Sequence, residues 1–522
     1  MIEGANFLGN TRSKENSNFL QAFNPATGEA LPDKFFIATT SEIQRAMEMA
    51  TEAFEAYKAL SAERRADFLC RIGEEIMALG DKLIQQAVTE SGLPEQRLIG
   101  ERGRTVNQLK MYADLLREGS WVDARIDRAD PERQPAPKPD LRNMLFPIGP
   151  VVVFGASNFP LAFSTAGGDT ASALAAGCPV IVKAHESHPG TNELVTKAIL
   201  QAAEKTAMPE GVFNSLLGRA ETGRQLVLHP MVKAVAFTGS YKAGRAIFDA
   251  AAARKVPVPV YAEMGSINPV FLLPEKLHSD PSALAALLAG SVTLGHGQFC
   301  TKPGIIIAKK SDSLERFKQM LTEHLEGHSS SWLLNRGIAE NYQKSRETLF
   351  NQEHIQILKH PTSEDEISKS AALAVVEASG FLENPAMHRE IFGPFSLIIE
   401  CDDQTSFEEV ASSLEGQLTL TFMGTEPELA GHRRLIDIAR EKAGRIIFNG
   451  VPTGVEVSPA MHHGGPYPAT TDPKFTSVGT GAIRRFLRPV AFQDCPDELL
   501  PEELKEGNPL GIYRLVDGIL TK

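Results

Sequence analysis

The sequence contains few cysteines, and they are widely scattered. Its 522 residues include five, at positions 70, 178, 300, 401 and 495. The odd count and the lack of any Cys-x-x-Cys pair argue against a disulfide framework or a structural zinc site. We therefore expect free thiols, no metal and a reducing, cytoplasmic location.

Dense basic runs are also missing. The 53 Lys and Arg against 65 Asp and Glu give a net charge of −12, so we do not expect nucleic acid as a partner. Residues 1–20 are polar and lack the apolar segment of a signal peptide. The longest uncharged run, 143–168, carries three prolines and several glycines. That composition favours strand, loop and helix start over a membrane span, so no membrane association is expected.

The length of the chain predicts two or three domains. Residues 41–116 show apolar positions at helical spacing, and Ser41 with Gln44 is a candidate capping box for the first helix. Residues 120–142 are polar and contain four prolines, which predicts a linker or extended arm.

After Pro150 the pattern alternates between strands and helices, which predicts a parallel sheet covered on both faces, with ligands at the carboxyl ends of its strands. A second α/β stretch begins near residue 267 and runs past residue 482. The first stretch is predicted to contain strands at 151–154, 179–182, 212–217 and 234–237, and helices at 161–176, 191–205 and 221–228.

The strand ending at Phe237 runs into a glycine turn at Gly239, and Ser240 can cap the helix that follows. Free N–H groups and the positive dipole end at a helix N-terminus suit a phosphate. An ordinary βα turn would look the same, so both interpretations stay open here.

Cys300 is the candidate nucleophile. It lies in the glycine-flanked segment Gly295–Gly304, between a helix-like stretch at 281–294 and a β-like run at 304–308. A nucleophilic thiol needs access and a lowered pKa, because only the thiolate attacks. Most free cysteines are instead small buried apolar residues, and this segment alone does not separate the two cases.

Six ordered motifs resemble those of the NAD(P)-dependent aldehyde dehydrogenase superfamily, and the resemblance covers residues 24–493. Further segments at 448–457, 463–466, 477–479 and 484–489 resemble the branch that holds α-ketoglutarate semialdehyde (2,5-dioxovalerate) dehydrogenases and a bacterial NADP-dependent aldehyde dehydrogenase. The six motifs are Ser157–Pro160, Val182–Lys183, Phe237–Ser240, Glu263–Gly265, Gly297–Cys300 and Glu390–Pro394.

The resemblance implies a reaction through covalent catalysis. Cys300 would add to the aldehyde, and the resulting oxyanion would expel hydride and leave a thioester. Asn158 and the backbone N–H of Cys300 would stabilise that oxyanion, although Asn158 is also a plausible turn residue. Glu263 would activate water, for which a pKa raised by an apolar site is expected; it could instead be a solvated strand end. His463 would assist the thiol or the water, or merely bond a backbone carbonyl.

The cofactor implied is NAD(P)+. Lys183 would reach the adenosine ribose, Gly239 and Ser240 the pyrophosphate, and Glu390 with Phe392 the nicotinamide ribose. Glu186 would accept bonds from ribose hydroxyls, whereas Arg219 would pair with a 2′-phosphate. These two residues favour opposite cofactors, so no preference between NAD and NADP is drawn.

The substrate is an aldehyde, and the branch resemblance favours α-ketoglutarate semialdehyde. Phe159, Phe163 and Phe299 either line a tunnel to the thiol or pack in the core. A semialdehyde of a dicarboxylic acid would need a cation that spacing does not identify. Oxidation of medium or long aliphatic aldehydes, a CoA-acylating reaction and a catalytically silent structural role are the alternatives.

The implied fold is α/β and aldehyde dehydrogenase-like. A Rossmann-type parallel-sheet cofactor domain is expected at 1–119 and 143–262, and an α/β catalytic domain at 263–472. A small oligomerisation arm and a C-terminal tail are expected at 120–142 and 473–522. The arm would make the protein a homodimer or homotetramer.

Overall fold

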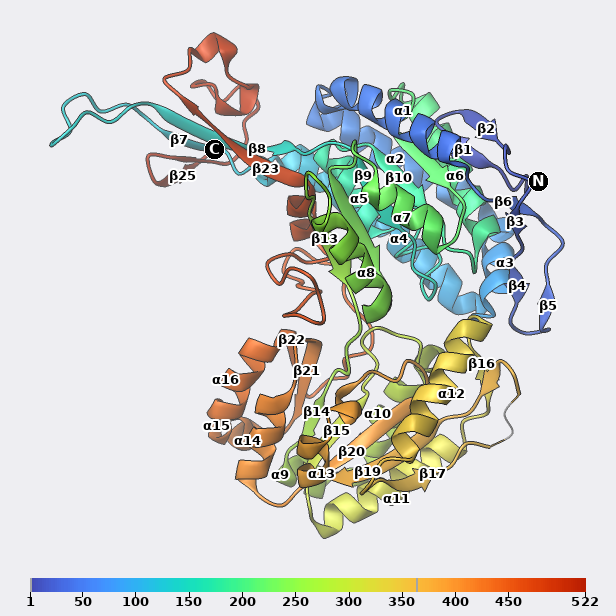
Figure 1. Cartoon of the computed structure of the whole chain (residues 1–522). Helices are drawn as coiled ribbons and strands as arrows, with labels where there is room; N and C mark the ends of the chain where they lie inside the picture. The colour runs from blue at the N-terminus through green and yellow to red at the C-terminus, as the bar shows by residue number, and fades with distance from the viewer. Residues whose placement is uncertain (1, 363–364) are drawn as a thin grey trace.

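The computed structural model describes residues 2–362 and 365–522. Its elements form two sheet-centred units, one above the other in Figure 1, and a slender arm that projects from the upper unit. The chain passes from the upper sheet to the lower one after residue 263 and returns after residue 448. The predicted α/β class and the parallel-sheet unit are confirmed by this arrangement.

The first sheet has the strand order β13-β12-β9-β10-β11-β1-β2. Its five neighbouring strands from β13 to β11 are parallel, whereas β1 is antiparallel to β11 and to β2. The strands are β1 (Asn6–Leu8), β2 (Thr11–Ser13), β9 (Val151–Phe154), β10 (Val180–Lys183), β11 (Phe213–Leu216), β12 (Ala234–Thr238) and β13 (Val260–Glu263).

Alternate side chains of these strands enter two different apolar cores. Val151 and Val153 of β9 pack on one face of the sheet, and Val152 and Phe154 pack on the other. A strand buried on both faces is continuously apolar, which is why the sequence shows short unbroken β-branched runs here. The covering helices are α1 (Thr40–Lys58), α2 (Ala62–Ala78), α3 (Gly80–Ser91), α4 (Glu95–Glu118), α5 (Gly168–Ala176), α6 (Pro189–Lys205), α7 (Ala220–Leu228) and α8 (Tyr241–Ala252).

Two local predictions about these helices are wrong. Helix α1 is capped by Thr39, whose hydroxyl accepts from the N–H of Glu42 while the Glu42 carboxylate accepts from the N–H of Thr39. The capping box is therefore Thr39 with Glu42, and Ser41 with Gln44 lies inside the helix. The same four-residue pattern occurs twice in this segment, and the buried carboxylate of Glu42 decides between them.

The predicted helix at 161–176 begins only at Gly168. The N–H groups of Leu161 and Ala162 donate instead to the carboxylate of Glu101 on α4, at 2.8 and 2.9 Å. Those backbone groups are thus used by a distant side chain, and residues 159–167 form an irregular turn. The turn matters because it carries Phe159 and Phe163 toward the site.

The second sheet has the order β17-β19-β20-β15-β14-β21-β22, parallel except that β17 is antiparallel to β19. Its strands are β14 (Val270–Leu272), β15 (Ile305–Lys309), β17 (Gln356–Lys359), β19 (Ala372–Glu377), β20 (Phe395–Cys401), β21 (Gln417–Met423) and β22 (Ala443–Phe448). Its helices are α9 (Pro274–Ser279), α10 (Pro281–Thr293), α11 (Asp312–Glu326), α12 (Arg336–Phe350), α13 (Ala378–Glu383), α14 (Gln404–Ser413), α15 (Glu426–Gly431) and α16 (Arg433–Lys442).

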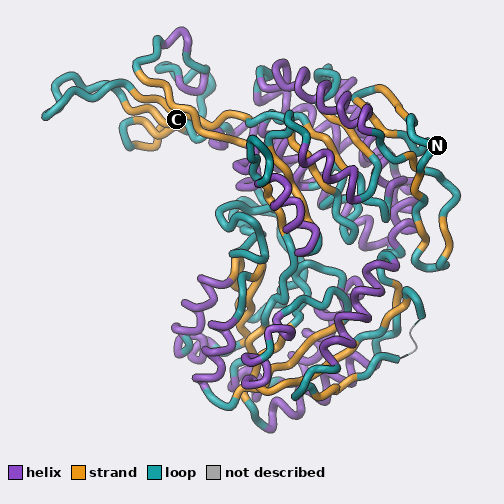
Figure 2. The backbone as a smooth tube through the Cα atoms, viewed as in Figure 1, coloured by secondary structure: helices purple, strands orange, loops and turns teal. Residues whose placement is uncertain are grey.

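The arm is a separate sheet of order β23-β8-β7-β24-β25, visible as the ribbon pairs that extend from the body in Figures 1 and 2. Strand β8 (Leu141–Pro147) pairs along its whole length with β23 (Leu487–Gln493). The segment 120–142 thus contains a 3-10 helix (Ser120–Val122), β7 (Arg125–Asp127) and the start of β8. The remaining arm strands are β24 (Arg514–Val516) and β25 (Ile519–Thr521). The domain boundaries stay predictions.

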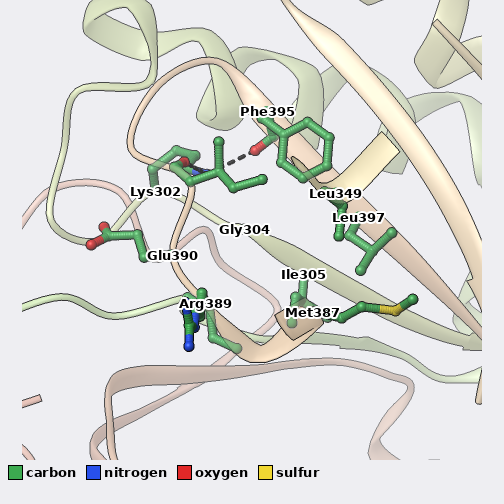
Figure 3. Close-up of a pocket in the computed structure, with 11 residues that line it drawn as sticks. Lys302, Gly304, Ile305, Leu349, Met387, Arg389, Glu390, Phe395 and Leu397 are labelled. Atoms are coloured by element: carbon green, nitrogen blue, oxygen red, sulfur yellow. Dashed lines mark hydrogen bonds between the residues drawn. The ribbon is translucent and has the colours of Figure 1, made fainter. Parts of the chain in front are cut away.

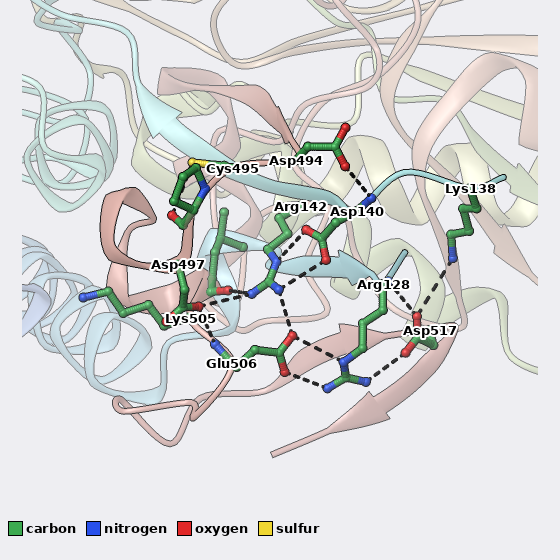
Figure 4. Close-up of polar contacts among 12 residues, drawn as sticks. Arg128, Lys138, Asp140, Arg142, Asp494, Cys495, Asp497, Lys505, Glu506 and Asp517 are labelled. Carbon is green, nitrogen blue, oxygen red and sulfur yellow. Dashed lines mark hydrogen bonds and ion pairs between the residues drawn. The ribbon is translucent and has the colours of Figure 1, made fainter. Parts of the chain in front are cut away.

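Arginines tie the C-terminal tail to the arm strands (Figure 4). Buried Arg142 donates to Asp140 at 2.9 Å, to Glu506 at 2.8 Å and to the carbonyl of Leu504 at 2.7 Å. Exposed Arg128 pairs with the other oxygen of Glu506 at 3.0 Å. The two guanidiniums lower the pKa of Glu506. They add to the apolar contacts of buried Ile126, Leu504 and Val516 between the arm strands and the tail.

Substitution of Arg142 by Ala should therefore release the tail. Loss of a buried charge with three acceptors is expected to cost about 3 kcal/mol locally. Limited proteolysis of residues 494–517, followed by mass spectrometry, measures the release. Arg128→Ala is the matched control, because it removes an exposed guanidinium from the same network. Its tail should be cleaved more slowly than that of R142A. Equal resistance of R142A and the unchanged protein would contradict this account.

Candidate active site

Cys300 lies where the two units meet, in the turn between helix α10 and strand β15. A short 3-10 segment, Leu294–Gly297, precedes it and has left-handed backbone at Gly295, His296 and Gly297. Gly297 is required there, since a Cβ would lie 2.3 Å from the carbonyl carbon of Gly393. The turn is therefore pressed against the Glu390–Pro394 segment.

Three side chains that are far apart in the sequence converge at this turn. The sulfur of Cys300 lies 3.6 Å from Nε2 of His463, and the same nitrogen lies 3.1 Å from Oε1 of Glu263. Glu263 ends strand β13 of the first sheet, and His463 belongs to the segment that returns from the second. The imidazole of His463 thus contacts the thiol and the carboxylate, not a backbone carbonyl.

Sulfur and carboxylate meet one nitrogen of His463, whereas Nδ1 is buried without a hydrogen-bond partner among the described residues. A single proton on Nε2 can be donated to only one of them at a time.

One atom each of Cys300, His463 and Glu263 could bind a metal ion, and these three atoms lie within 4.8 Å of one another. The prediction that no metal binds here stays a prediction.

The pKa of the Cys300 thiol is raised well above its usual value, first by burial and then by the nearby charge of Glu263. The expectation of a lowered pKa is therefore wrong for this arrangement. The guanidinium of Arg104 acts to lower this pKa but does not outweigh the other two effects. The thiol is therefore protonated near neutral pH.

Glu263 also departs from expectation. Burial of its carboxylate, which is only 3% exposed, acts to raise its pKa, but attraction and hydrogen bonding from His463 outweigh this, helped by Ser477 and Cys300. The hydroxyl of Ser477 donates to Oε2 at 2.7 Å. The pKa is lowered overall, so Glu263 is ionised and able to accept a proton at neutral pH. Sequence reasoning placed Ser477 in a motif but gave it no role.

The amide groups around Cys300 suit an oxyanion. The side-chain amide of Asn158 donates from Nδ2 to the backbone carbonyl of Gln298 at 3.0 Å. The backbone carbonyl of Asn158 accepts from the guanidinium of Arg97 at 2.6 Å. The backbone N–H of Cys300 has no acceptor among the residues described. Asn158 is 9% exposed, so it is held beside the turn by contacts on both its backbone and its side chain.

Asn268 is a positioning residue that the sequence did not reveal. Its side-chain amide donates to the carbonyls of Cys300 at 2.9 Å and Lys302 at 3.0 Å. Its own backbone has φ +46° and donates to Gln417 at 3.2 Å. An Asn-Pro dipeptide is typical of a turn, but nothing local says which carbonyls the Asn268 side chain will meet.

The three predicted phenylalanines form one cluster beside the thiol. The ring of Phe159 lies 5.3 Å from that of Phe163 and 5.2 Å from that of Phe299, both in edge contacts. Phe163 lies 6.3 Å from the ring of His463. The three rings therefore form an apolar wall that extends to the imidazole of His463.

The residues predicted to hold a dinucleotide lie at the carboxyl ends of the first sheet. Lys183 ends β10, Gly239 follows β12, and Ser240 caps α8 by accepting from the N–H of Ala243 at 3.4 Å. Glu186 and Arg219 approach one another at 3.9 Å after β10 and β11, and both are half-exposed or more. The edge of the sheet thus offers free N–H groups, a cation and an anion to one ligand.

Glu390 lies in a pocket whose other charged residues are Lys302 and Arg389 (Figure 3). Burial raises the pKa of Glu390 to about 7 and lowers that of Lys302 to about 8. Lys302 donates to the carbonyls of Ile391 at 3.1 Å and Phe395 at 2.7 Å, which fixes the segment carrying Glu390 and half-buried Phe392. Sequence reasoning missed Lys302.

Charged groups at the carboxyl edge of a parallel sheet, next to a cysteine and a carboxylate, are typical of oxidoreductases that use a nucleotide and a thiol. The model of the aldehyde dehydrogenase family matches residues 11–331. The chain belongs to this family, and its activity is the oxidation of an aldehyde. Members of the family are generally NAD(P)-dependent.

Individual relatives agree with this assignment. The chain is 49% identical over 99% of both chains to "Alpha-ketoglutaric semialdehyde dehydrogenase 2" of Azospirillum brasilense. It is 44% identical, again over 99% of both, to "Alpha-ketoglutaric semialdehyde dehydrogenase" of Acinetobacter baylyi. Its fold matches that of a Thermus 1-pyrroline-5-carboxylate dehydrogenase with bound NAD, at a TM-score of 0.78 and 21% identity over 94% and 92% of the two chains. No helix among the described residues is long and apolar enough to cross a membrane.

The charge of Glu263 makes a prediction about the thiol. Glu263→Gln keeps the shape of the side chain but removes a negative charge that raises the pKa of Cys300. Alkylation of Cys300 by iodoacetamide should increase with pH in both proteins, because the thiolate reacts, and should begin at lower pH in E263Q. Mass spectrometry separates Cys300 from the partly exposed Cys70 and Cys495, which serve as internal controls. An unshifted or alkaline-shifted profile in E263Q would refute the assigned contact.

Proposed function

We propose that the protein oxidises 2,5-dioxopentanoate (α-ketoglutarate semialdehyde) to α-ketoglutarate with NAD(P)+. The observation that supports this most is similarity over nearly the full chain to two α-ketoglutaric semialdehyde dehydrogenases, at 49% and 44% identity. The convergence of Cys300, His463 and Glu263 supplies the reacting groups such an oxidation needs.

The first step is the addition of sulfur to the aldehyde carbon. The Cys300 thiol gives its proton to the Glu263–His463 pair, and the thiolate bonds to the carbonyl carbon. The aldehyde oxygen then carries the negative charge, and it accepts hydrogen bonds from the Cys300 N–H and the Asn158 amide. Because the resting thiol has a raised pKa, proton acceptance by this pair is part of the step.

The second step is the loss of hydride and the third is hydrolysis. Bound NAD(P)+ supplies the hydride acceptor, for which Glu390 and Lys183 would hold the ribose groups. A thioester on Cys300 remains. The Glu263–His463 pair first passes the proton taken from Cys300 to solvent. Glu263 then removes a proton from water as the water oxygen attacks the thioester carbon. The C–S bond breaks, the thiolate takes the proton held by Glu263, and the product leaves as a carboxylate once its acid proton has passed to solvent.

We further propose that the arm pairs protomers into a homodimer or homotetramer. The support is its shape: strand β25 forms one edge of the arm sheet and leaves Ile519 and Leu520 more than two-thirds exposed. Exposed apolar strands at a sheet edge suit pairing with another chain. A cytoplasmic location is consistent with five cysteines that are all free.

The substrate proposal is tested by comparing aldehydes. The value of kcat/KM for 2,5-dioxopentanoate should exceed that for hexanal by at least about 100-fold, the discrimination that a polar site can give against an apolar analogue. Absorbance of the reduced nicotinamide measures both reactions. A preference for hexanal would instead identify an aliphatic aldehyde dehydrogenase.

The role of Cys300 is tested by substitution. Cys300→Ser should lower kcat by at least about 1,000-fold, and full retention of activity would mean that the nucleophile lies elsewhere.

The cofactor preference is tested at Glu186. Its carboxylate would repel a 2′-phosphate, so Glu186→Ser should raise kcat/KM for NADP relative to NAD by about 10-fold or more. Arg219→Ala, its matched partner across the 3.9 Å contact, should change the ratio in the opposite direction. If both variants leave the ratio unchanged, neither residue faces the adenosine ribose.

A further inference from the structure

Helix α4 directs two arginines toward the thiol. Arg97 and Arg104 are seven residues apart and therefore lie on the same side of α4, with Glu101 between them. Both are largely buried, although arginine is a residue type that seldom is. Their position in the middle of a helix gave no sign of this in the sequence.

Arg104 is the guanidinium without an acceptor. Its Nε and Nη2 atoms are buried and have no hydrogen-bond partner, and no carboxylate lies within 4.0 Å among the residues described. Glu101 is a charged neighbour but makes no hydrogen bond to Arg104: its Oε1 accepts from the backbone at Leu161 and Ala162, and its Oε2 has no partner among the described residues. A buried charge left without partners is costly unless a ligand supplies them.

The two other arginines near the thiol are already engaged. Arg97 donates to the carbonyl of Asn158 at 2.6 Å, and its guanidinium lies 5.0 Å from the ring of Phe159. It thus positions the oxyanion amide. Arg445 donates to the carbonyls of Pro452 at 2.6 Å and Gly454 at 3.1 Å, so it holds the loop after β22. Nε and Nη1 of Arg97 and Nε of Arg445 are also unpartnered, but each of these two guanidiniums is held by a backbone carbonyl, whereas Arg104 makes no hydrogen bond to any described residue.

Arg104 also lies at a suitable place relative to the reacting atoms. Its guanidinium carbon is 5.3 Å from the ring of Phe163, which in turn is 6.3 Å from the ring of His463. Arg104 is also close enough to Cys300 and Glu263 to interact with them electrostatically. The carboxylate of a five-carbon semialdehyde lies about 5–6 Å from its aldehyde carbon when extended. A substrate bonded to Cys300 along the Phe163 wall therefore reaches toward Arg104.

We propose that Arg104 binds the carboxylate of the substrate and so selects acidic semialdehydes over uncharged aldehydes. This inference rests on the proposed function and names a residue for it. A planar guanidinium can donate two parallel hydrogen bonds to a carboxylate. An uncharged aldehyde leaves the same buried donors unsatisfied, which penalises its binding.

The test compares variants on aldehydes matched in length. Arg104→Gln should lower kcat/KM for 2,5-dioxopentanoate by at least about 30-fold, chiefly through KM, because a buried charge pair is lost. Loss of this cation also raises the pKa of Cys300, so kcat/KM for pentanal should fall as well, but at least about 10-fold less than that for 2,5-dioxopentanoate. Arg104→Lys keeps the charge without the planar fork and should show an intermediate loss. Lys110→Gln removes an exposed cation from the same helix and should change neither substrate.

Equal losses on both substrates, or no loss on 2,5-dioxopentanoate, would overturn the role of Arg104. Melting temperatures separate misfolding from loss of recognition, and R104K remains informative if R104Q does not fold. Succinate semialdehyde distinguishes this inference from the proposed function. If the unchanged protein prefers succinate semialdehyde and R104Q loses that preference, Arg104 binds a carboxylate and only the named substrate is wrong. If the unchanged protein prefers pentanal to both acids, the proposed function and the inference both fail.

Discussion

The contact of one imidazole nitrogen with a sulfur and a carboxylate is the interaction on which the site depends. It joins the end of a strand in the first sheet, a turn before a strand in the second, and the segment that returns toward the arm. Glu263 acts to raise the pKa of Cys300, and the Cys300 thiol helps to lower the pKa of Glu263. Glu263 keeps its charge because His463 and Ser477 stabilise it, and that same charge holds the proton on Cys300.

This arrangement also keeps the resting thiol protonated. A permanent thiolate beside the charge of Glu263 would be costly and open to oxidation. In the mechanism we propose, the thiol stays neutral until its proton passes to the neighbouring pair, and an oxyanion then takes over the negative charge beside Asn158. The raised pKa of Cys300 and the lowered pKa of Glu263 are thus two sides of one electrostatic balance.

Backbone positions around the thiol are set by groups that carry no chemistry themselves. Asn268 bonds the carbonyls on either side of Thr301, Lys302 holds the segment of Glu390, and Gly297 permits the close approach of Gly393. Arg97 and Glu101 do the same for the 158–162 turn from helix α4. The site is therefore built as much by polar side chains that bind backbone as by apolar packing.

Much of the molecule could be predicted from local patterns. The strands of the first sheet are short β-branched runs, since both faces are buried, and their alternation with helices implied parallel pairing. The motifs that surround Cys300, Glu263 and Asn158 pointed to the family. The errors arose where a side chain binds backbone groups that the local pattern had assigned differently. The N–H of Leu161 donates to Glu101, so the predicted helix does not begin there. The N–H of Thr39 donates to Glu42, which places the cap of α1 at Thr39.

The amino-acid sequence by itself determined most of the elements and, through its family motifs, the class of reaction, because these depend on residue types and short-range spacing. Only the tertiary structure decided the direction of the pKa shifts, the double contact of His463, and the free guanidinium of Arg104. Those properties depend on which charges are buried together and which donors lack acceptors, and such distances between remote segments exist only in the folded chain.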